Sequence, residues 1–255
     1  MERKTNLKNR IIPSILVNNY QVIKSKQFSD YRTFGNLTQA VELFSRRFVD
    51  ELIILDIESS KKKLPIDSRI LKLMTSNSLI PITYGGGIKN LSDIENCLFT
   101  GCEKIILNSI LYENPKFLLE AVKNFGSQSI TVSIDVKKFN NEYKIFNHSK
   151  NNTEETNLID YLKFCQESRC GEIVINSVDK DGMMGGYDLD LINIVRNLIE
   201  RPLIINGGCS KPKDMKDAIT LGVDACMAAS IFYFTRYSYA DIKEFLNKEN
   251  INIRF

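Results

Sequence analysis

The sequence predicts a (βα)8 barrel, an α/β fold of the TIM-barrel type, built as one domain over residues 1–255. Three observations support this prediction. Eight short apolar runs rich in β-branched residues recur along the chain, helical patterns separate these runs, and the two halves repeat one another at a nearly constant offset. A chain of 255 residues is long enough to form such a barrel as one unit.

The apolar runs are the expected barrel strands, because near-continuous apolar runs suit a parallel sheet that is covered on both faces. They occupy residues 11–17, 52–57, 80–84, 104–108, 130–136, 172–177, 202–206 and 223–228. Helical patterns lie between them, for example at 38–48 and 117–124. The fifth run is followed by an expected insertion at 139–154, with a small hairpin at 143–146.

The repeat is visible in residues that follow equivalent strands. Gly85-Gly86 after the third run matches Gly207-Gly208 after the seventh, an offset of 122. Asn108-Ser109 matches Ala229-Ser230 at an offset of 121, and Glu51 matches Glu172 at the same offset. These spacings predict a duplicated half-barrel with four βα units in each half.

Composition and charge exclude several classes of protein. A net charge of +3 is too small to indicate a nucleic-acid partner. No run of about 20 apolar residues is present to span a membrane, and the polar start Met1–Lys4 does not resemble a signal peptide, so we expect a cytoplasmic protein. The six cysteines form no CxxC pair and the chain has one histidine, so we expect no metal and no cofactor.

The repeated glycine turns predict two phosphate sites at the mouth of the barrel. Glycines let the backbone approach a ligand closely, and residues that open helices present free N–H groups. One glycine turn is more often only structural, but two sets at one offset are more specific. A substrate with a phosphate at each end would fit the candidate positions, which include Gly86, Asn108, Ser109, Gly208, Ala229 and Ser230.

Acidic residues follow several of the expected strands. Asp135 ends the fifth, where a carboxylate points into the barrel mouth and can act as an acid or base, or else cap the next loop. Asp56 ends the second strand, and Asp179 and Asp181 follow the sixth, although Asp181-Gly182 can also form a simple turn. His148 lies in the expected insertion and is interpreted as a surface residue.

These motifs together resemble the cyclase subunit of imidazole glycerol phosphate synthase, the HisF family. The resemblance spans nearly the whole chain, including the residues 50–57, Gly85-Gly86-Gly87-Ile88, Phe125-Gly126-Ser127-Gln128, Ile134-Asp135-Val136-Lys137 and 228–232. It implies a catalytic role for Asp135, a substrate-loop lysine at Lys24 and a further phosphate position at Gly182. It also implies a phosphorylated small-molecule ligand, a ribulosyl bisphosphate in the family's reaction.

The resemblance further implies a glutaminase subunit that forms a heterodimer with the barrel and supplies ammonia. In this family ammonia enters through charged residues at the amino-terminal face of the barrel. The corresponding positions are Arg10, Glu51, Lys104 and Glu172, two bases and two acids that can neutralise one another. An ordinary ion-pair cluster at the barrel base is the alternative interpretation.

One departure from the family is prominent. The family carries a second catalytic aspartate at the end of the first strand, and that position is Leu16. Leucine cannot transfer a proton, so we hypothesise a divergent amidotransferase subunit with weak or lost cyclase activity. It would deliver ammonia to another acceptor or a third protein, as in pathways that make acetamidino sugars. Two alternatives are a working synthase subunit in histidine biosynthesis and a stand-alone phosphosugar isomerase.

Overall fold

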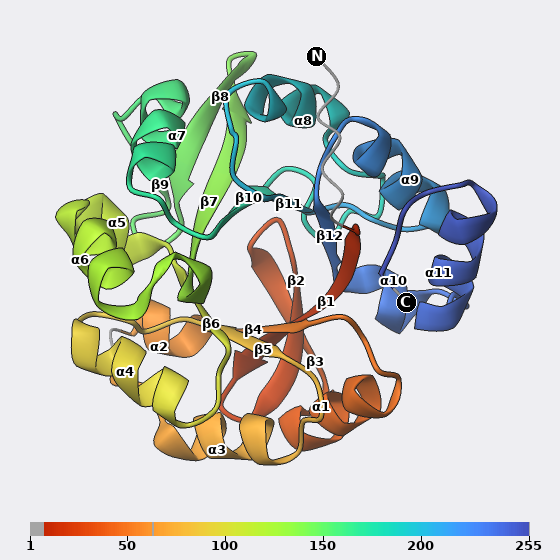
Figure 1. The fold of residues 1–255 in the computed structure, drawn as a ribbon, viewed down its shortest axis with the longest axis horizontal. Coiled ribbons are helices and arrows are strands. Elements are labelled where there is room, and N and C mark those ends of the chain that lie inside the picture. Colours follow the sequence, from red (N-terminus) through yellow and green to blue (C-terminus); the bar gives the residue numbers. More distant parts are fainter. Residues whose placement is uncertain (1–7, 63, 255) are drawn as a thin grey trace.

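The computed structural model describes residues 8–62 and 64–254 (Figure 1). The stretch Met1–Lys4, in which the sequence indicated no signal peptide, lies outside the described residues. In the part of the chain that is described, no helix is long and apolar enough to cross a membrane.

Eight parallel strands within the described residues form a closed barrel, as the sequence predicted. Each strand pairs with the next one in chain order, and β12 pairs with β1, so the sheet has no free edge among these strands. The strands are β1 (Arg10–Asn18), β4 (Leu52–Asp56), β5 (Ile82–Gly85), β6 (Lys104–Leu107), β7 (Ile130–Phe139), β10 (Glu172–Ser177), β11 (Leu203–Asn206) and β12 (Ala225–Ala228).

Helices surround the barrel in Figure 1 and bury their apolar faces against it. On α1, for example, Leu37, Val41 and Phe44 recur at helical spacing and are buried, while Asn36 caps the first turn by accepting from the Thr38 N–H. The helices are α1 (Leu37–Arg46), α2 (Ile57–Lys61), α3 (Ser68–Ser76), α4 (Leu91–Phe99), α5 (Ser109–Glu113), α6 (Lys116–Phe125), α7 (Leu158–Glu167), α8 (Leu189–Arg196), α9 (Pro212–Thr220), α10 (Ser230–Phe234) and α11 (Tyr239–Lys248), with a 3-10 turn η1 (Ser127–Ser129).

The hydrophobic core has two separate parts. The larger part lies between the strands and the helices. The smaller part fills the barrel interior with side chains from the middle of the strands: Ile12, Ile53, Leu55, Ile106, Val174, Ile204, Ala225 and Met227. Side chains in a strand alternate between its two faces, so most strands contribute to both parts. The exceptions are β5 and β7, whose buried apolar residues belong to the larger part.

The half-barrel repeat extends further than the sequence indicated. The expected insertion after β7 is present, and β7 pairs with β8 (Glu142–Asn147), which then pairs with β9 (Asn152–Thr153). An equivalent excursion follows β1, where β2 (Gln21–Lys26) and β3 (Ser29–Asn36) form an antiparallel hairpin that the sequence analysis did not predict. Each half therefore begins with a long strand and an antiparallel ribbon.

The two ribbons begin with the same kind of turn. Asn19 and Tyr20 after β1 have φ values of 47° and 66°, and Asn140 and Asn141 after β7 have φ values of 49° and 64°. Positive φ at both central residues is the mark of a two-residue hairpin turn whose twist matches the strands. Asparagine tolerates this conformation, whereas tyrosine rarely adopts it, and this explains why the first turn gave a weak signal in the sequence.

Candidate functional site

A pocket of about 860 Å³ opens at the carboxyl ends of the barrel strands. Its lining combines apolar side chains with a small number of polar ones, as is typical of small-molecule sites. In a (βα)8 barrel this end is where active sites lie. Of the residues singled out in the sequence, the pocket contains Leu16, Lys24, Asp56, Gly86, Asn108, Ser109, Asp135 and Asp181.

Gly86 occupies a position that another residue could not fill without displacing the backbone. Its φ is +113°, and a Cβ atom placed on it would lie 2.1 Å from the carbonyl oxygen of Asp56 at the end of β4. Gly207 repeats this arrangement in the second half, with φ +100° and a Cβ position 2.6 Å from the carbonyl oxygen of Ser177. The structural counterpart of Gly86 is therefore Gly207, at an offset of 121, and not Gly208 as the sequence match indicated. The strand-end glycines are therefore required by close backbone packing, whatever their role toward a ligand.

Asp135 lies on β7 beside Asn176 of β10 and lines the pocket, with only 4% of its side chain exposed. Its carboxylate accepts hydrogen bonds from the side-chain amides of Asn108 and Asn176, each at 3.0 Å. A buried carboxylate needs such donors, because burial without partners disfavours its charge. These neighbours hold Asp135 with its oxygens at the pocket wall.

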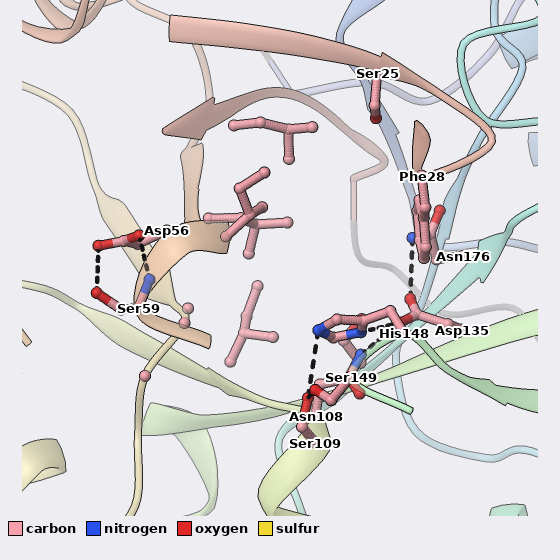
Figure 2. Close-up of a pocket in the computed structure, with 18 of the residues that line it drawn as sticks. Ser25, Phe28, Asp56, Ser59, Asn108, Ser109, Asp135, His148, Ser149 and Asn176 are labelled. Atoms are coloured by element: carbon pink, nitrogen blue, oxygen red, sulfur yellow. Dashed lines mark hydrogen bonds and ion pairs between the residues drawn. The ribbon is translucent and has the colours of Figure 1, made fainter. Parts of the chain in front are cut away.

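His148 is the functional candidate that sequence reasoning missed. Its Nδ1 lies 3.2 Å from an oxygen of Asp135, and its Nε2 lies 3.4 Å from the hydroxyl of Ser109 (Figure 2). The sequence analysis expected a surface position, but the loop after β8 carries the residue back over the barrel mouth, where it lines the pocket. The sequence offered one signal, which was that His148 is the chain's single histidine.

Leu16 and Asp135 occupy equivalent positions in the two halves of the barrel. Leu16 pairs with Leu55 on the next strand, and Asp135 pairs with Asn176. Leu55 and Asn176 are themselves separated by the repeat offset of 121. Leu16 also lines the pocket, so one wall has a carboxylate where the equivalent wall has an isobutyl group.

The β2–β3 hairpin crosses the barrel mouth and rests on the loop after β10. The backbone N–H of Gln27 donates to the carbonyl of Asp181 at 2.9 Å, and the Ser25 hydroxyl donates to the Asp181 carboxylate at 3.1 Å. The Nζ of Lys24 lies 3.6 Å from the same carboxylate. A Cβ on Gly182 would lie 2.3 Å from the carbonyl oxygen of Ser25. The hairpin therefore covers the Asp181-Gly182 turn directly.

The two predicted phosphate sets differ in their access to the pocket. Gly86, Asn108 and Ser109 line it, whereas Gly182, Gly208, Ala229 and Ser230 are absent from its lining. Gly208, Ala229 and Ser230 are buried. The local backbones still match, because Asn108 and Ala229 cap five-residue helices with φ values of −138° and −125°. The halves therefore share a backbone framework, but only the first set faces the pocket, and the β2–β3 hairpin covers the Gly182 position of the second.

Asp56 has a structural role at the start of α2. Its carboxylate accepts hydrogen bonds from the backbone N–H groups of Glu58 and Ser59 at 3.0 Å and from the Ser59 hydroxyl at 2.8 Å. These are the hydrogen bonds that an N-cap aspartate usually makes to the first turn of a helix. Although Asp56 borders the pocket, its oxygens are already occupied by these donors.

At the opposite end of the barrel, the four charged residues singled out in the sequence form a closed ring. Arg10 contacts Glu51 at 2.7 Å and Glu172 at 2.5 Å, and Lys104 contacts each of these acids at 3.0 Å. All four side chains are at most 14% exposed. Glu51 also accepts a hydrogen bond of 2.6 Å from the hydroxyl of Thr83.

The ring stabilises the charges of its members. Burial opposes ionisation of Glu51, but the adjacent Lys104 and Arg10 outweigh it and lower the pKa of Glu51 below its ordinary value. Burial likewise opposes the charge on Arg10, while Glu172 and Glu51 raise its pKa. Every member of the ring therefore has two oppositely charged neighbours, which compensates for the loss of water.

Fold and site together define a (βα)8 barrel with a mixed apolar and polar pocket at one end, a charged ring at the other and an apolar interior between them. The chain belongs to the histidine biosynthesis protein family, whose model matches residues 10–238. Its relatives place it in the HisF branch of this family.

Three curated relatives illustrate this relationship. A Campylobacter jejuni protein, assigned by inference as imidazole glycerol phosphate synthase subunit hisF2, is 41% identical over 97% of this chain and 99% of its own length. The imidazole glycerol phosphate synthase subunit HisF of Petrotoga mobilis is 32% identical, with coverage of 97% and 99%. A Leptospira interrogans protein, also assigned by inference as such a subunit, is 36% identical, with coverage of 96% and 97%.

Proposed function

We propose that this barrel is the ammonia-accepting subunit of a glutamine amidotransferase complex, that its pocket binds a bisphosphate-type ligand, and that its cyclase activity is weak or lost. The observation that carries this proposal is Leu16, which matches Asp135 in register and lines the same pocket. A leucine cannot exchange protons with a ligand. Loss of an essential acid–base group costs about 10²–10⁴-fold in rate.

The closed charged ring supports the partner in this proposal. A glutaminase subunit would bind the barrel at the end that carries Arg10, Glu51, Lys104 and Glu172, forming a heterodimer. Ammonia would then pass the ring and the apolar interior to reach the pocket. Neutral ammonia suits an apolar interior, because it carries no charge that burial would penalise. The complex would act in the cytoplasm, a reducing compartment that suits six unpaired, buried cysteines.

The acceptor of ammonia would differ from that of a working synthase. An acetamido sugar that becomes an acetamidino sugar, bound by a possible third amidotransferase protein, is the acceptor that we favour. This part rests on analogy within the family. Apolar surface at the rim supports a changed ligand or partner there, since Met183 is 51% exposed beside the Asp181-Gly182 turn.

A working imidazole glycerol phosphate synthase subunit in histidine biosynthesis is the second candidate. The name of the Petrotoga mobilis relative and the retained Asp135 favour it. This candidate needs another group to replace the carboxylate absent at position 16. Asp56 is poorly suited, because its oxygens already accept three hydrogen bonds from α2.

The first test is turnover of the family's ribulosyl bisphosphate substrate with a high concentration of ammonium salt. Native protein, Leu16→Asp and the uncharged control Leu16→Asn would be compared. We expect native turnover at least about 10²-fold below that of Leu16→Asp. The control should stay at the native level, because asparagine supplies no acid or base.

The outcomes separate the two candidates. Native turnover at an ordinary cyclase rate would contradict the divergent subunit and make this a histidine-pathway enzyme. Co-expression with the glutaminase of the same organism provides an independent check on the partner. Failure of the two proteins to associate, together with unchanged glutaminase activity, would remove the amidotransferase complex from the proposal.

A further inference from the structure

His148 is a partly buried side chain in the pocket wall, and the proposed function assigns it no role. Its side chain is 21% exposed and lies between Asp135 and Ser109 (Figure 2). The ring of Phe28, at the tip of the β2–β3 hairpin, meets it edge-on with 6.2 Å between ring centroids. Contacts on three sides therefore hold the imidazole in a defined orientation.

The neighbours of Asp135 determine which ring nitrogen carries a hydrogen. Asp135 accepts from Asn108 through one of its oxygens and from Asn176 through the other. An ionised carboxylate is an acceptor only, so the His148 Nδ1 at 3.2 Å must donate to it. The other nitrogen, Nε2, is then left to face Ser109 and the pocket.

Two hydroxyls converge on the same spot as Nε2. The Ser149 hydroxyl lies 3.4 Å from the Ser109 hydroxyl, which itself lies 3.4 Å from Nε2. All three residues line the pocket. Hydroxyls and a protonated imidazole can all donate hydrogen bonds, and the oxygens of a phosphate group accept them.

The other charged groups of the pocket leave His148 well placed to supply positive charge here. Lys24 lies against Asp181 on the hairpin side, at 3.6 Å. Among the residues that the structure describes, Asp135 is the titratable group in contact with His148. The remaining titratable or charged residues in the pocket lining are Asp30, Tyr31, Asp56, Lys89 and Glu113. Asp135 orients the ring through the Nδ1 hydrogen bond, so that Nε2 is the nitrogen available to a ligand.

We propose that His148 is a pH-dependent ligand for a phosphate group bound against Ser109 and Ser149. The imidazolium form donates from Nε2 to the anion and adds a positive charge, whereas the neutral form leaves a lone pair facing it. Asp135 is the positioning residue that orients the ring. This inference rests on the phosphate-type ligand of the proposed function and identifies the group that binds one end of it.

The linkage between proton and anion makes the inference quantitative. If protonation of His148 strengthens anion binding, the bound anion must strengthen protonation by the same factor. Each tenfold gain in affinity moves the titration midpoint of the ring about one pH unit upward. Because the chain has a single histidine, the ring gives a single Cε1–H resonance in the NMR spectrum of tag-free protein.

The experiment is a pH titration of that resonance with and without inorganic sulfate, alongside sulfate affinity by calorimetry. Sulfate has the tetrahedral oxygens of phosphate and keeps a constant charge across the range in which histidine titrates. We expect saturating sulfate to raise the midpoint by about one unit and sulfate affinity to fall about tenfold from pH 5.5 to pH 8.5. The Ser109→Ala variant should lose the sulfate-induced shift.

Two variants connect the effect to the imidazole. His148→Gln should bind sulfate at about the native high-pH affinity, with no dependence on pH. The matched control is Lys150→Gln, which removes a positive charge from the same loop. Lys150 is outside the pocket lining and pairs with Glu154 at 3.2 Å, so this variant should retain the native pH dependence. The native titration needs no variant and stands even if His148→Gln fails to fold.

Three results would overturn the inference. One is that sulfate binds but leaves the titration midpoint of the His148 ring unchanged. The phosphate site of the proposed function would then stand, but His148 would not be part of it. Another is the absence of sulfate binding in every variant, which would remove the phosphate-type ligand itself. The third is covalent labelling of Ser109 by a sulfonyl fluoride. The contacts run from Asp135 through His148 to Ser109, which is the order of a hydrolase triad. Labelling would therefore indicate that Ser109 is a nucleophile and not a phosphate ligand.

Discussion

At the scale of single residues, Gly86 gives a direct test of why the strand-end glycines are present. Gly86→Ala places a Cβ against the Asp56 carbonyl at a φ of +113°, so we expect a loss of about 2–4 kcal/mol in the free energy of unfolding. Urea denaturation measures this loss. Gly35→Ala is the matched control, because no atom lies within 4 Å of its Cβ position, and its effect should stay within about 0.5 kcal/mol.

Glu51 tests the energetic role of the charged ring. Glu51→Gln leaves Arg10 and Lys104 with one acid between them, and breaking a buried ion pair in this way costs about 3–5 kcal/mol. The measurement is again urea denaturation at neutral pH. Glu244→Gln is the control, since its pair with Lys248 is exposed and should contribute about 1 kcal/mol or less. Equal effects of the two variants would contradict a stabilising ring.

The same variant predicts a pH dependence. The pKa of Glu51 is lowered in the folded protein, so its contribution is complete above its ordinary value of 4.5 and is lost as the pH falls through the lowered value. The difference in stability between native protein and Glu51→Gln should therefore shrink below about pH 4.5. A difference that stays constant with pH would mean that packing, and not charge, accounts for the loss.

At the scale of elements, the β2–β3 hairpin depends on a small number of polar contacts at the barrel mouth. Asp181→Asn removes the charge that faces Lys24 and weakens the hydrogen bond from Ser25. We expect amide hydrogen exchange in the hairpin to become about 5- to 30-fold faster, which corresponds to a loss of about 1–2 kcal/mol. Strand β8 of the second ribbon is the internal control and should be unchanged.

The ribbons also show where sequence reasoning succeeded and failed. The second ribbon was predicted as an insertion over 139–154, but its hairpin was placed at 143–146, a stretch that lies within β8 in the structure. The turn itself falls at Asn140-Asn141, between β7 and β8. The first ribbon was missed, since its turn contains Tyr20, whose positive φ is unusual for an aromatic residue. In the structure the Tyr20 hydroxyl donates to Asp67 at 2.5 Å, a tertiary contact that helps to hold this turn.

At the scale of the whole molecule, the two half-barrels should unfold together. Strand pairs β6–β7 and β12–β1 join the halves, and the closed sheet gives them one common interior core. We expect a single thermal transition in calorimetry, with equal calorimetric and van't Hoff enthalpies. Two separate transitions would contradict a single domain over residues 1–255.

Leu16 and the four ring residues were identified through the resemblance to the HisF family. The strands and helices of the barrel, the half-barrel repeat and the place of Asp135 at the barrel mouth followed from the sequence pattern itself. Apolar periodicity specifies elements, and strand ends place side chains at one end of the barrel or the other, so these features depend on local pattern alone. Only the tertiary structure decided that the β2–β3 hairpin covers the Asp181-Gly182 turn and that His148 lies against Asp135. Those contacts join residues from separate ribbons and strands, and their formation depends on how long loops fold back across the closed barrel, which no local pattern encodes.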